Sequence, residues 1–456
     1  MADKHRTDIR PNISHSIPYG IHIIGGGLAG FTTGLLLAQG GFAVHIYDPR
    51  LASDNAGNAK AKDNGLTTTM NPMAWQHLGK LGVIANLSKE AYAPIDTIAV
   101  TDGVTGGVVG KGRDAPPMKN LPNNLAKNLI DNALIAWHSK GEGSRPLAWV
   151  VNTHALLNAL HSLAKQSPLI TLHAGKAGCI TGFAPHHKSL GTAAAMLTTE
   201  TGGEIPASLV IAADGSRSRM RSLAKIKTYA SSSSSPRQTA LTAIVSVANP
   251  HKQTAWQVFL SGGPLALMPC YQKNVLALVW TRPSHEATRL MALSDEAFIA
   301  EVNTAGQYAF GGITQVKQRA SFPLIPCYAY WPLTHRLVLV GDAAHTILPL
   351  AGQGYNLTMG DGVALVKILA EAIQTGLDIG SRAVVNRYGR LRISHTASMS
   401  LACQGLDGVF SRSPQSIRQL ASLGMAVVAK TPLRRVAEWV AAGDSITAKS
   451  KLRQPF

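Results

Sequence analysis

Residues 21–48 constrain the fold more than any other part of the chain. The sequence IHII at 21–24 predicts a buried strand, GGGLAG follows at 25–30, and a helical pattern continues to Gln39. A second predicted strand over 42–47 ends at Asp48. The order of strand, glycine-rich turn, helix, strand and acidic residue is that of the dinucleotide-binding βαβ unit. It therefore predicts an α/β fold with a parallel sheet.

Each glycine of this unit has a predicted role. Gly25 makes the turn after the strand, Gly27 leaves room for a pyrophosphate, and Gly30 lets the helix pack on the strand. Gly34 is expected to extend that close packing by one turn. Asp48 is expected to accept hydrogen bonds from the ribose hydroxyls of an adenosine. The unit predicts binding of an ADP-containing cofactor, without separating FAD from NAD.

A second motif begins with an apolar strand over 337–340 that ends at Gly341 and Asp342. The run Gly352-Gln353-Gly354 then opens a helical pattern over 356–373. A glycine-rich helix start presents free backbone N–H groups and a positive dipole. Such an end suits the electron-rich edge of a reduced flavin, with Asp342 accepting from ribityl hydroxyls. The alternative interpretation is a tight strand–helix turn in an α/β core.

A third motif, Asp214-Gly215, ends the strand-like run over 207–213 and precedes a helix that carries Arg219 and Arg221. Two interpretations stay open from these residues alone. The Asp214 carboxylate caps the helix that follows, or it faces a pyrophosphate through water with the arginines nearby.

The remaining pattern predicts a second, smaller set of elements. A helix is expected over 66–81, with Asn71-Pro72 as its start signal, and a turn leading into a helix over 149–163. Short, evenly spaced strands indicate an antiparallel sheet, expected to form the wall and floor of a substrate cavity. These strands cover 241–247, 254–260, 265–270 and 275–281.

The formal net charge of +18 favours an acidic partner, either an anionic membrane surface or an acidic protein. No nucleic-acid motif accompanies the charge, so nucleic acid is not expected.

The four cysteines show no metal spacing, which predicts reduced thiols and no metal site. No run of membrane length appears, and the polar residues 1–19 are expected to form a loose tail rather than a signal. The mixed basic and apolar residues after 381 predict either surface-seeking helices or an ordinary packed helical tail.

Taken in chain order, 25–48, 214–221 and 341–356, the three motifs and their spacing resemble the FAD-dependent aromatic hydroxylases of the para-hydroxybenzoate hydroxylase type. The resemblance runs from Ile21 over nearly the whole chain. The sequence from Gly341 to Leu357 is closest to the ubiquinone-biosynthesis branch of these flavoproteins. Residues 262–269, and Tyr388 with Arg392 ahead of 406–410, resemble that branch too.

The resemblance implies FAD as cofactor, with O2 as co-substrate and NAD(P)H or a ferredoxin-type donor as reductant. Oxygen would reach a phenol ring through a flavin C4a-hydroperoxide, so no general base is assigned. Pro349 and Gly352 are expected near the flavin ring, whereas His345 is interpreted as a buried structural residue. The cofactor-binding residues expected from the motifs and the resemblance are Gly25, Gly27, Gly30, Asp48, Asp214, Gly215, Gly341, Asp342, Pro349, Gly352, Gln353, Gly354 and Asn356.

The expected architecture is a Rossmann-like FAD-binding domain interleaved with an antiparallel-sheet substrate domain, followed by C-terminal helices. The FAD-binding domain is expected to comprise 20–83, 148–226 and 320–380. The substrate domain is expected to comprise 84–147 and 227–319, and the helical region 381–456.

The leading hypothesis is hydroxylation of a polyprenylated phenol in ubiquinone biosynthesis, by a cytoplasmic protein that lies peripherally at the inner face of the membrane. The alternatives are a hydroxylase of a small soluble aromatic compound and an FAD-binding scaffold of a biosynthetic complex. Two departures from the branch motivate the scaffold: Asn64, where a basic residue is usual, and Val151, where an acidic one is usual. In this alternative, a partner protein of the same pathway would complete the flavin site.

Overall fold

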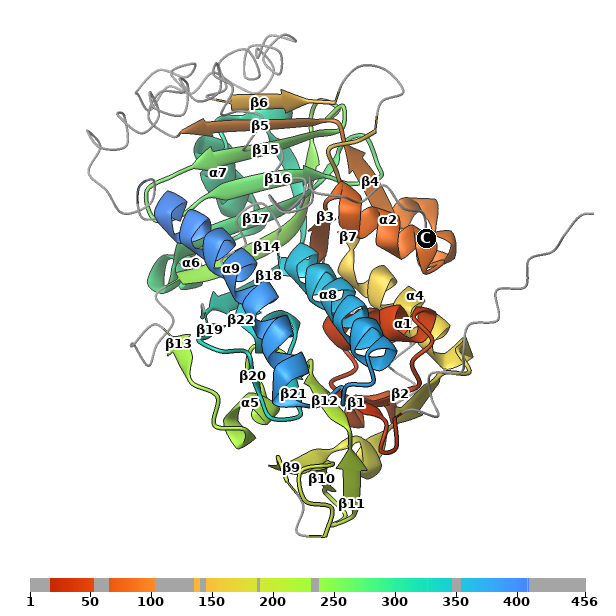
Figure 1. The fold of residues 1–456 in the computed structure, drawn as a ribbon. Coiled ribbons are helices and arrows are strands. Elements are labelled where there is room, and N and C mark those ends of the chain that lie inside the picture. Colours follow the sequence, from red (N-terminus) through yellow and green to blue (C-terminus); the bar gives the residue numbers. More distant parts are fainter. Residues whose placement is uncertain are drawn as a thin grey trace, which may run out of the picture.

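A central parallel sheet and a second, larger sheet organise the chain (Figure 1). The computed structural model describes residues 17–52, 65–102, 135–139, 145–186, 189–230, 238–325, 327–346, 354–407 and 409. It combines several sheets, one of them mostly parallel, with packed helices, so the predicted α/β class is confirmed.

The central sheet has six strands in the order β20-β21-β12-β1-β2-β8. All neighbours pair in parallel except β20, which runs antiparallel to β21. Parallel strands place their carboxyl ends along one edge, and the turns of the three sequence motifs follow β1, β12 and β21 there. The strand bounds are Ile21–Ile24 (β1), Val44–Tyr47 (β2), Ile170–His173 (β8), Leu209–Ala212 (β12), Leu333–Thr334 (β20) and Leu337–Leu339 (β21).

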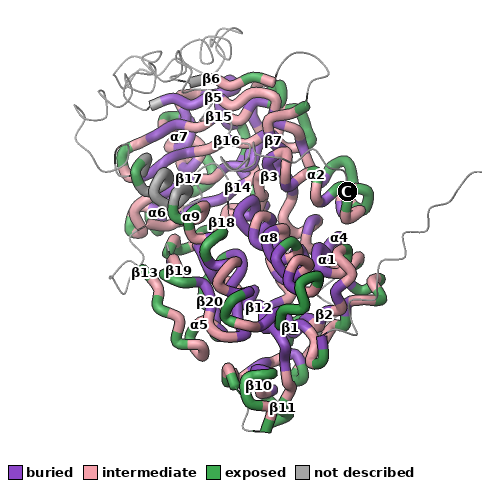
Figure 2. The backbone as a smooth tube through the Cα atoms, in the orientation of Figure 1, coloured by how far each residue is buried: buried purple, intermediate pink, exposed green. Residues whose placement is uncertain are grey.

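Helices cover one face of this sheet and a small antiparallel sheet covers the other. Ile23 and Ile46 point into the helical layer, where they pack with Phe31 and Leu365. Val210 packs on the opposite side with Leu197. Figure 2 shows the purple buried residues running through these layers. The helices are α1 (Leu28–Gln39), α4 (Thr153–Gln166), α8 (Gly354–Gln374) and α9 (Arg382–Asp407), and the small sheet comprises β9 (Ile180–Ala184), β10 (Ala195–Thr199) and β11 (Glu204–Ala207).

The second sheet has seven strands in the order β18-β14-β17-β16-β15-β5-β6. The four strands predicted between 241 and 281 all lie in it and pair antiparallel as expected. One pairing differs, because β5 joins β15 in parallel. The bounds are Thr97–Asp102 (β5), Ile135–His138 (β6), Gln238–Val247 (β14), Thr254–Phe259 (β15), Leu265–Pro269 (β16), Val275–Pro283 (β17) and Ile313–Leu324 (β18); helices α6 (Ser284–Met291) and α7 (Asp295–Ala305) pack against it.

Two smaller sheets complete the described strands. One of them, β3-β7-β4, contacts the seven-stranded sheet, where the Thr69 hydroxyl lies 3.3 Å from the Met268 sulfur. The other is β13-β19-β22. The bounds are Thr67–Met70 (β3), Tyr92–Ile95 (β4), Ala148–Asn152 (β7), Thr228–Ala230 (β13), Cys327–Ala329 (β19) and His345–Thr346 (β22); helices α2 (Pro72–Lys80) and α5 (Arg219–Leu223) and short 3-10 turns join the rest.

Two predicted elements were wrong in part. The helix expected over 66–81 begins only at Pro72, where the Asn71 side chain accepts from the Ala74 N–H. The residues before it form β3, because consecutive threonines favour a strand. The turn expected from Trp149 is the strand β7, and Asn152 caps the helix that follows.

The ends and boundaries also differ in detail. Ile17, expected in a loose tail, is buried against the main core, while residues 1–16 lie outside the described residues. Strand β18 continues through the boundary expected between 319 and 320. In the C-terminal region α9 packs on the core through Val384 and Val385, and most residues after 407 lie outside the described part.

Candidate active site

The turns after β1, β2, β12 and β21 meet at the carboxyl edge of the central sheet. They carry Gly25, Asp48, Asp214 and Gly341 respectively. In open α/β sheets ligands bind outside this edge. Strand order therefore brings the sequence motifs to one side of the molecule, although Gly25 and Gly341 lie 316 positions apart in the sequence.

The glycine-rich turn is shaped for close approach of a cofactor. Gly25 has a φ of +114°, and a Cβ there would lie 2.4 Å from the Ala213 carbonyl oxygen. A Cβ at Gly30 would lie 1.8 Å from the Gly25 carbonyl oxygen, so both glycines are required by packing. By contrast, a Cβ at Gly27 would meet nothing within 4 Å. This open side fits the predicted pyrophosphate position.

Asp48 is a buried carboxylate with a basic neighbour that the sequence analysis missed. It accepts from the Gly26 N–H at 2.9 Å and from the Arg50 Nε at 2.9 Å and Nη2 at 2.6 Å. Burial raises the pKa of Asp48, but the hydrogen bonds from Arg50 and Gly26 outweigh burial and hold that pKa below its usual value. The Arg50 side chain is 79% exposed, and a ribose at Asp48 would have to displace it from the carboxylate. Ribose binding by Asp48 stays a prediction, and it requires such a movement.

Asp214 holds the start of α5, as the first of its two interpretations expects. Its Oδ1 accepts from the Ser218 hydroxyl at 2.5 Å and its Oδ2 from the Met220 N–H at 3.0 Å. Arg221 of α5 donates through Nη1 to the Ala343 carbonyl oxygen at 2.9 Å. This segment therefore supports the turn after β21. Gly215, next to Asp214, has a φ of +83° and open space where a Cβ would stand.

The turn after β21 presents Asp342 at the surface. Gly341 has a φ of +57° and donates its N–H to the Asp361 Oδ2 at 2.8 Å. Among the described residues, no hydrogen bond or ion pair to the Asp342 carboxylate is found. The side chain of Asp342 is exposed, yet neighbouring atoms crowd its carboxylate. The resulting partial desolvation raises the pKa of Asp342 above its usual value, and the smaller effect of His345 opposes this rise. An exposed carboxylate acceptor at this edge fits the hydroxyls of a flavin side chain.

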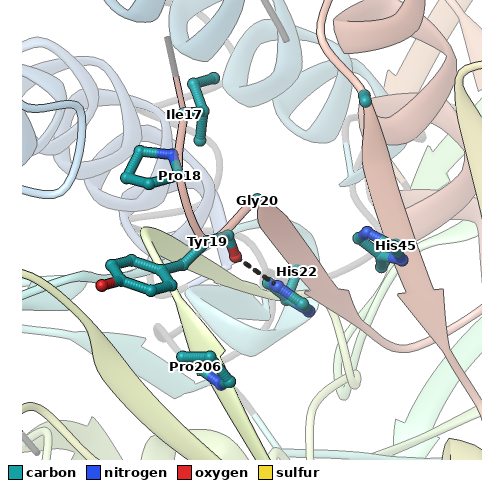
Figure 3. A pocket seen from close by; sticks show the side chains of 8 residues that line it. Ile17, Pro18, Tyr19, Gly20, His22, His45 and Pro206 are labelled. Atoms are coloured by element: carbon teal, nitrogen blue, oxygen red, sulfur yellow. Dashed lines mark hydrogen bonds between the residues drawn. The ribbon is translucent and has the colours of Figure 1, made fainter. Parts of the chain in front are cut away.

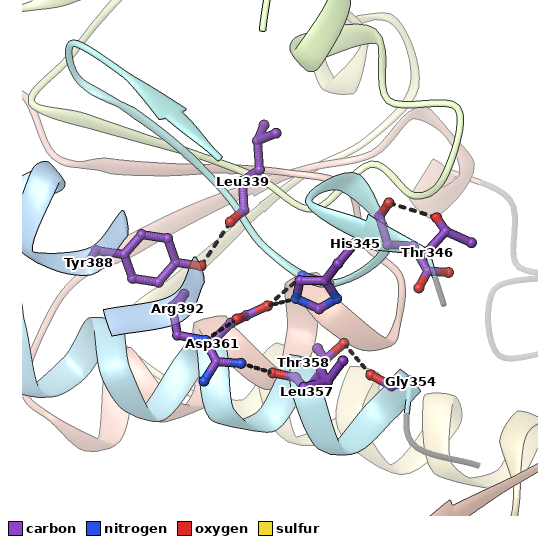
Figure 4. A network of polar contacts seen from close by, with 11 residues as sticks. Leu339, His345, Thr346, Gly354, Leu357, Thr358, Asp361, Tyr388 and Arg392 are labelled. Atoms are coloured by element: carbon purple, nitrogen blue, oxygen red, sulfur yellow. Dashed lines mark hydrogen bonds and ion pairs between the residues drawn. The ribbon is translucent and has the colours of Figure 1, made fainter. Parts of the chain in front are cut away.

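His345 lies buried behind this turn (Figure 4). Its Nε2 is 2.8 Å from the Asp361 Oδ2, while its Nδ1 has no partner among the described residues. The observed partners agree with a structural residue. Asp361 and Arg392, which form the rest of this network, were not among the expected site residues. The signal for Asp361 was a carboxylate within the mostly apolar α8, and Arg392 had been noted only for the resemblance of its segment to the ubiquinone-biosynthesis branch.

The remaining expected residues divide into two groups. Gly354 begins α8, and a Cβ there would meet nothing within 4 Å; Asn356 is buried in the first turn of the same helix. Pro349, Gly352 and Gln353 lie outside the described residues. The flavin contacts expected at the helix start therefore stay a prediction, with open space beside Gly354 as the observation.

The two departures from the expected branch have different settings. Val151 is fully buried in the main core, where its side chain packs among apolar residues. Asn64 lies outside the described residues.

A hollow of about 380 Å³ lies at the opposite edge of the central sheet (Figure 3). It is lined by Tyr19, His22, His45 and Pro206, at the amino ends of β1 and β2. The cofactor motifs follow the carboxyl ends of these strands, so this hollow is separate from the candidate site. Within the described ranges, no cluster of side chains suits a metal ion and no helix has the length and apolar character to cross a membrane.

The parallel sheet, the glycine-rich turn and the acidic strand ends are those of a flavin-dependent oxidoreductase. The chain belongs to the family described as FAD binding domain, whose model matches residues 19–395. It is an FAD-dependent monooxygenase, and the resemblance to the ubiquinone-biosynthesis hydroxylases is confirmed.

Several relatives match over most of their length. The chain is 29% identical to ubiquinone hydroxylase UbiL of Rhodospirillum rubrum, over 91% of this chain and 87% of that protein. It is 28% identical to the 3-demethoxyubiquinol 3-hydroxylase of Escherichia coli, over 90% and 94%. It is 25% identical to the human mitochondrial ubiquinone biosynthesis monooxygenase COQ6, over 91% of each chain.

Solved structures share the fold at lower sequence identity. The p-nitrophenol 4-monooxygenase PnpA of Pseudomonas putida superposes with a TM-score of 0.68 at 13% identity, over 93% of this chain and 98% of that one. PqsL of P. aeruginosa with bound 2-aminobenzoylacetate gives 0.66 at 15% identity, over 91% and 100%. These likenesses establish the fold.

Proposed function

We propose that this protein hydroxylates the aromatic ring of a polyprenylated phenol in ubiquinone biosynthesis. The observation that carries the proposal is the nearly full-length similarity to proteins named as ubiquinone hydroxylases, from bacteria to human. The site supports it, because its open glycines and exposed Asp342 fit FAD.

In this proposal the protein's residues bind and orient the cofactor. Gly27 admits the pyrophosphate, Asp48 holds the adenosine ribose once Arg50 moves, and Asp342 accepts from the ribityl hydroxyls. Gly354 faces the ring, and the same role is proposed for Gly352 and Gln353, which lie outside the described residues. Reduced FAD, when bound, supplies the chemistry that activates O2. We propose NAD(P)H as the reductant. We also propose that oxygen reaches the phenol ring by the route that the family resemblance implies.

Hydroxylation of a small soluble aromatic compound is the second candidate. It is favoured by the shared fold with p-nitrophenol 4-monooxygenase, although fold alone does not fix a substrate. Deleting the gene and identifying the accumulated quinone precursor tests the choice. Accumulation of a prenylated phenol lacking one hydroxyl supports the proposal, and unchanged quinone with loss of growth on an aromatic compound supports the alternative.

The FAD-binding scaffold is separated from both enzymes by a measurement on the purified protein. NAD(P)H oxidation and O2 consumption that depend on an added phenol identify an enzyme. A flavin-loaded protein that consumes neither, alone or with the other proteins of the pathway, supports the scaffold.

A surface patch supports a membrane-peripheral location at the cytoplasmic face. It comprises the exposed aromatic residues Tyr229, Tyr330 and Trp331 with the exposed Lys225 and Lys227, and we name it the aromatic patch. Tyr229 and Tyr330 make an edge-to-face contact, and the Tyr330 N–H donates to the Lys227 carbonyl oxygen. Tyr and Trp favour the water–lipid interface, and lysines attract anionic headgroups. A polyprenyl substrate resides in that bilayer.

A further inference from the structure

A buried carboxylate joins the flavin turn to the C-terminal helix. Asp361 lies in the middle of α8 and is fully buried. It accepts from three donors: the Gly341 N–H at 2.8 Å, the His345 Nε2 at 2.8 Å and the Arg392 Nε at 2.6 Å. Figure 4 shows His345 and Arg392 on either side of this carboxylate. One side chain thus connects the strand-end turn, α8 and α9.

Helix α9 is fixed to this network by more than one contact. The Arg392 Nη2 donates to the Leu357 carbonyl oxygen at 3.1 Å, and the guanidinium lies over Gly360, where a Cβ would be 3.0 Å from Nη1. The Tyr388 hydroxyl donates to the Leu339 carbonyl oxygen, at the end of β21, at 2.8 Å. A Cβ at position 360 would require the guanidinium to shift by a few tenths of an ångström, so the two helices are in close contact here.

The turn itself is held from two sides. Asp361 binds the Gly341 N–H on one side, and Arg221 binds the Ala343 carbonyl oxygen on the other. Asp342 lies between these two anchored residues. The backbone position of Asp342 is therefore set by groups outside the turn.

We propose that Arg392 is a positioning residue for the flavin: acting through Asp361, it holds the Gly341–Asp342 turn in the geometry that presents Asp342 to the cofactor. The inference rests on the proposed FAD contact of Asp342 and extends it to α9, which no sequence motif for FAD includes. Without Arg392 the buried Asp361 loses its charged donor in a site closed to water. Asp361 would then turn toward another donor or admit water, and the Gly341 N–H would lose its fixed partner. Supporting residues of this kind set the precision of a binding site.

The test is a double-mutant cycle on FAD affinity. Apoprotein of wild type, Arg392→Met, Asp342→Asn and the double variant is titrated with FAD, with flavin fluorescence as the readout. We expect Arg392→Met alone to raise the Kd about tenfold or more. In the Asp342→Asn background it is expected to add less than about twofold, because both changes remove the same contact. Full, additive weakening in both backgrounds overturns the inference, as does wild-type affinity in Arg392→Met.

A matched control addresses general loosening of the helices. Arg387 pairs with Glu371 of α8, and so links the same two helices at the surface. Arg387→Met is expected to leave the FAD Kd within about twofold of wild type; a loss equal to that of Arg392→Met overturns the inference. If Arg392→Met does not fold, Arg392→Lys, which keeps the charge and loses the planar fork, takes its place in the cycle.

This outcome is separable from the proposed function. Wild-type apoprotein that binds no FAD contradicts the function itself. If the wild-type protein binds FAD but the effects of Arg392→Met and Asp342→Asn on the Kd are additive, only the role of Arg392 is contradicted. The visible circular dichroism of bound flavin gives a second readout, expected to change in Arg392→Met and to stay unchanged in Arg387→Met.

Discussion

The side chain of Asn356 is hydrogen-bonded to the backbone of Asn71, across 285 positions of sequence. Its Oδ1 accepts from the Asn71 N–H at 3.0 Å, and its Nδ2 donates to the Thr69 carbonyl oxygen at 3.2 Å. The start of α8, which belongs to the second motif, is thereby joined to the end of β3 and the cap of α2. Asn356 was expected to contact the cofactor, and that role stays a prediction beside this observed one.

Asn356→Ala is expected to lower the free energy of unfolding by about 1–3 kcal/mol, because it leaves a buried N–H without its acceptor. Urea unfolding followed by circular dichroism measures the change. Asn86→Ala, which removes an exposed side-chain bond to Gly82, serves as the control and should shift stability by less than about 0.5 kcal/mol. An unchanged midpoint in Asn356→Ala would contradict the structural role.

Gly27→Val and Gly34→Ala form a contrasting pair. A Cβ at Gly27 meets open space, so the valine variant is expected to fold normally yet lose FAD, because its side chain occupies the pyrophosphate position. A Cβ at Gly34 would lie 2.8 Å from the Ile46 Cδ1, so the alanine variant is expected to lose about 1–3 kcal/mol of stability and keep its FAD affinity when folded. Thermal unfolding of apoprotein and FAD titration measure both. Normal FAD binding by Gly27→Val would mean that the βαβ assignment is wrong.

Asp342→Ala is expected to weaken FAD retention by about tenfold or more, since it removes a charged acceptor for hydroxyl donors. The flavin released on dilution is quantified by its fluorescence. Because Asp342 has no protein partner among the residues described, apoprotein stability should change little. Asp295→Ala, at an exposed surface ion pair with Arg319, is the control. Full FAD occupancy with unchanged affinity would refute the role of Asp342.

Stability is expected to fall between pH 6.5 and pH 4 because of His22. Burial lowers the pKa of His22 from 6.5 to about 4, opposed by its bond to the Tyr19 carbonyl oxygen and assisted by His45 and His173. In this window the unfolded chain binds more protons, so the free energy of unfolding rises with pH. The contribution of neutral His22 to the free energy of unfolding is complete above pH 6.5 and is lost as the pH falls toward 4. The total loss amounts to about 3 kcal/mol.

Urea unfolding of wild type and His22→Gln at pH 7.5 and pH 5 measures this contribution. Glutamine does not titrate, so the variant should lose about 2 kcal/mol less than wild type over that step. His285→Gln, at a side chain 82% exposed, should retain the wild-type pH dependence. Equal pH dependence in wild type and His22→Gln would show that His22 is not the titrating group.

The aromatic patch is expected to bind anionic vesicles. Each lysine close to an anionic surface contributes about 1 kcal/mol, so changing both Lys225 and Lys227 to Gln should weaken binding about tenfold or more. Co-sedimentation with anionic and neutral vesicles at low and high salt is the measurement. Lys252 and Lys273, exposed in turns of the larger sheet, provide the control pair. Binding to neither vesicle at low salt would rule out the patch and favour an acidic partner protein.

Point variants are preferable to truncation in this experiment. Removing the residues after Ser381 would also remove Arg392 and Tyr388, which are bonded to the core behind the candidate site. A loss of vesicle binding would then have two explanations.

Much of the fold was predictable from local pattern. The glycine spacing from Gly25 to Gly30 defines the first βαβ unit because only glycine fits those close approaches, and period and turn signals gave the strands of the larger sheet. The parallel β5–β15 pairing was not predictable, because it joins strands far apart in the sequence. The alternation of inward and outward side chains along a strand is the same whether its neighbour runs parallel or antiparallel. The strand β3 was missed because the residues before the Asn71 N-cap were assigned to the same helix as the residues after it.

The site was predictable where a backbone requirement specifies the residue. Gly341 and Asp342 follow a strand, and their position could be inferred. The partners that hold them could not: Arg221 contacts the turn, and Arg392 contacts Asp361 behind it, by tertiary packing alone. Likewise, the Arg50 side chain on Asp48 depends on a rotamer that sequence does not specify.

The position of β21 in the central sheet affects how the chain acquires its structure during synthesis. The ribosome releases β1, β2 and β12 long before residues 337–339 exist, so one edge of β12 has no neighbour while the larger sheet is being translated. An unpaired apolar edge recruits other chains, and pairing over such sequence distance is slow. A nascent chain of this protein is therefore expected to stay prone to aggregation until residues 337–339 emerge, and to bind chaperones during translation.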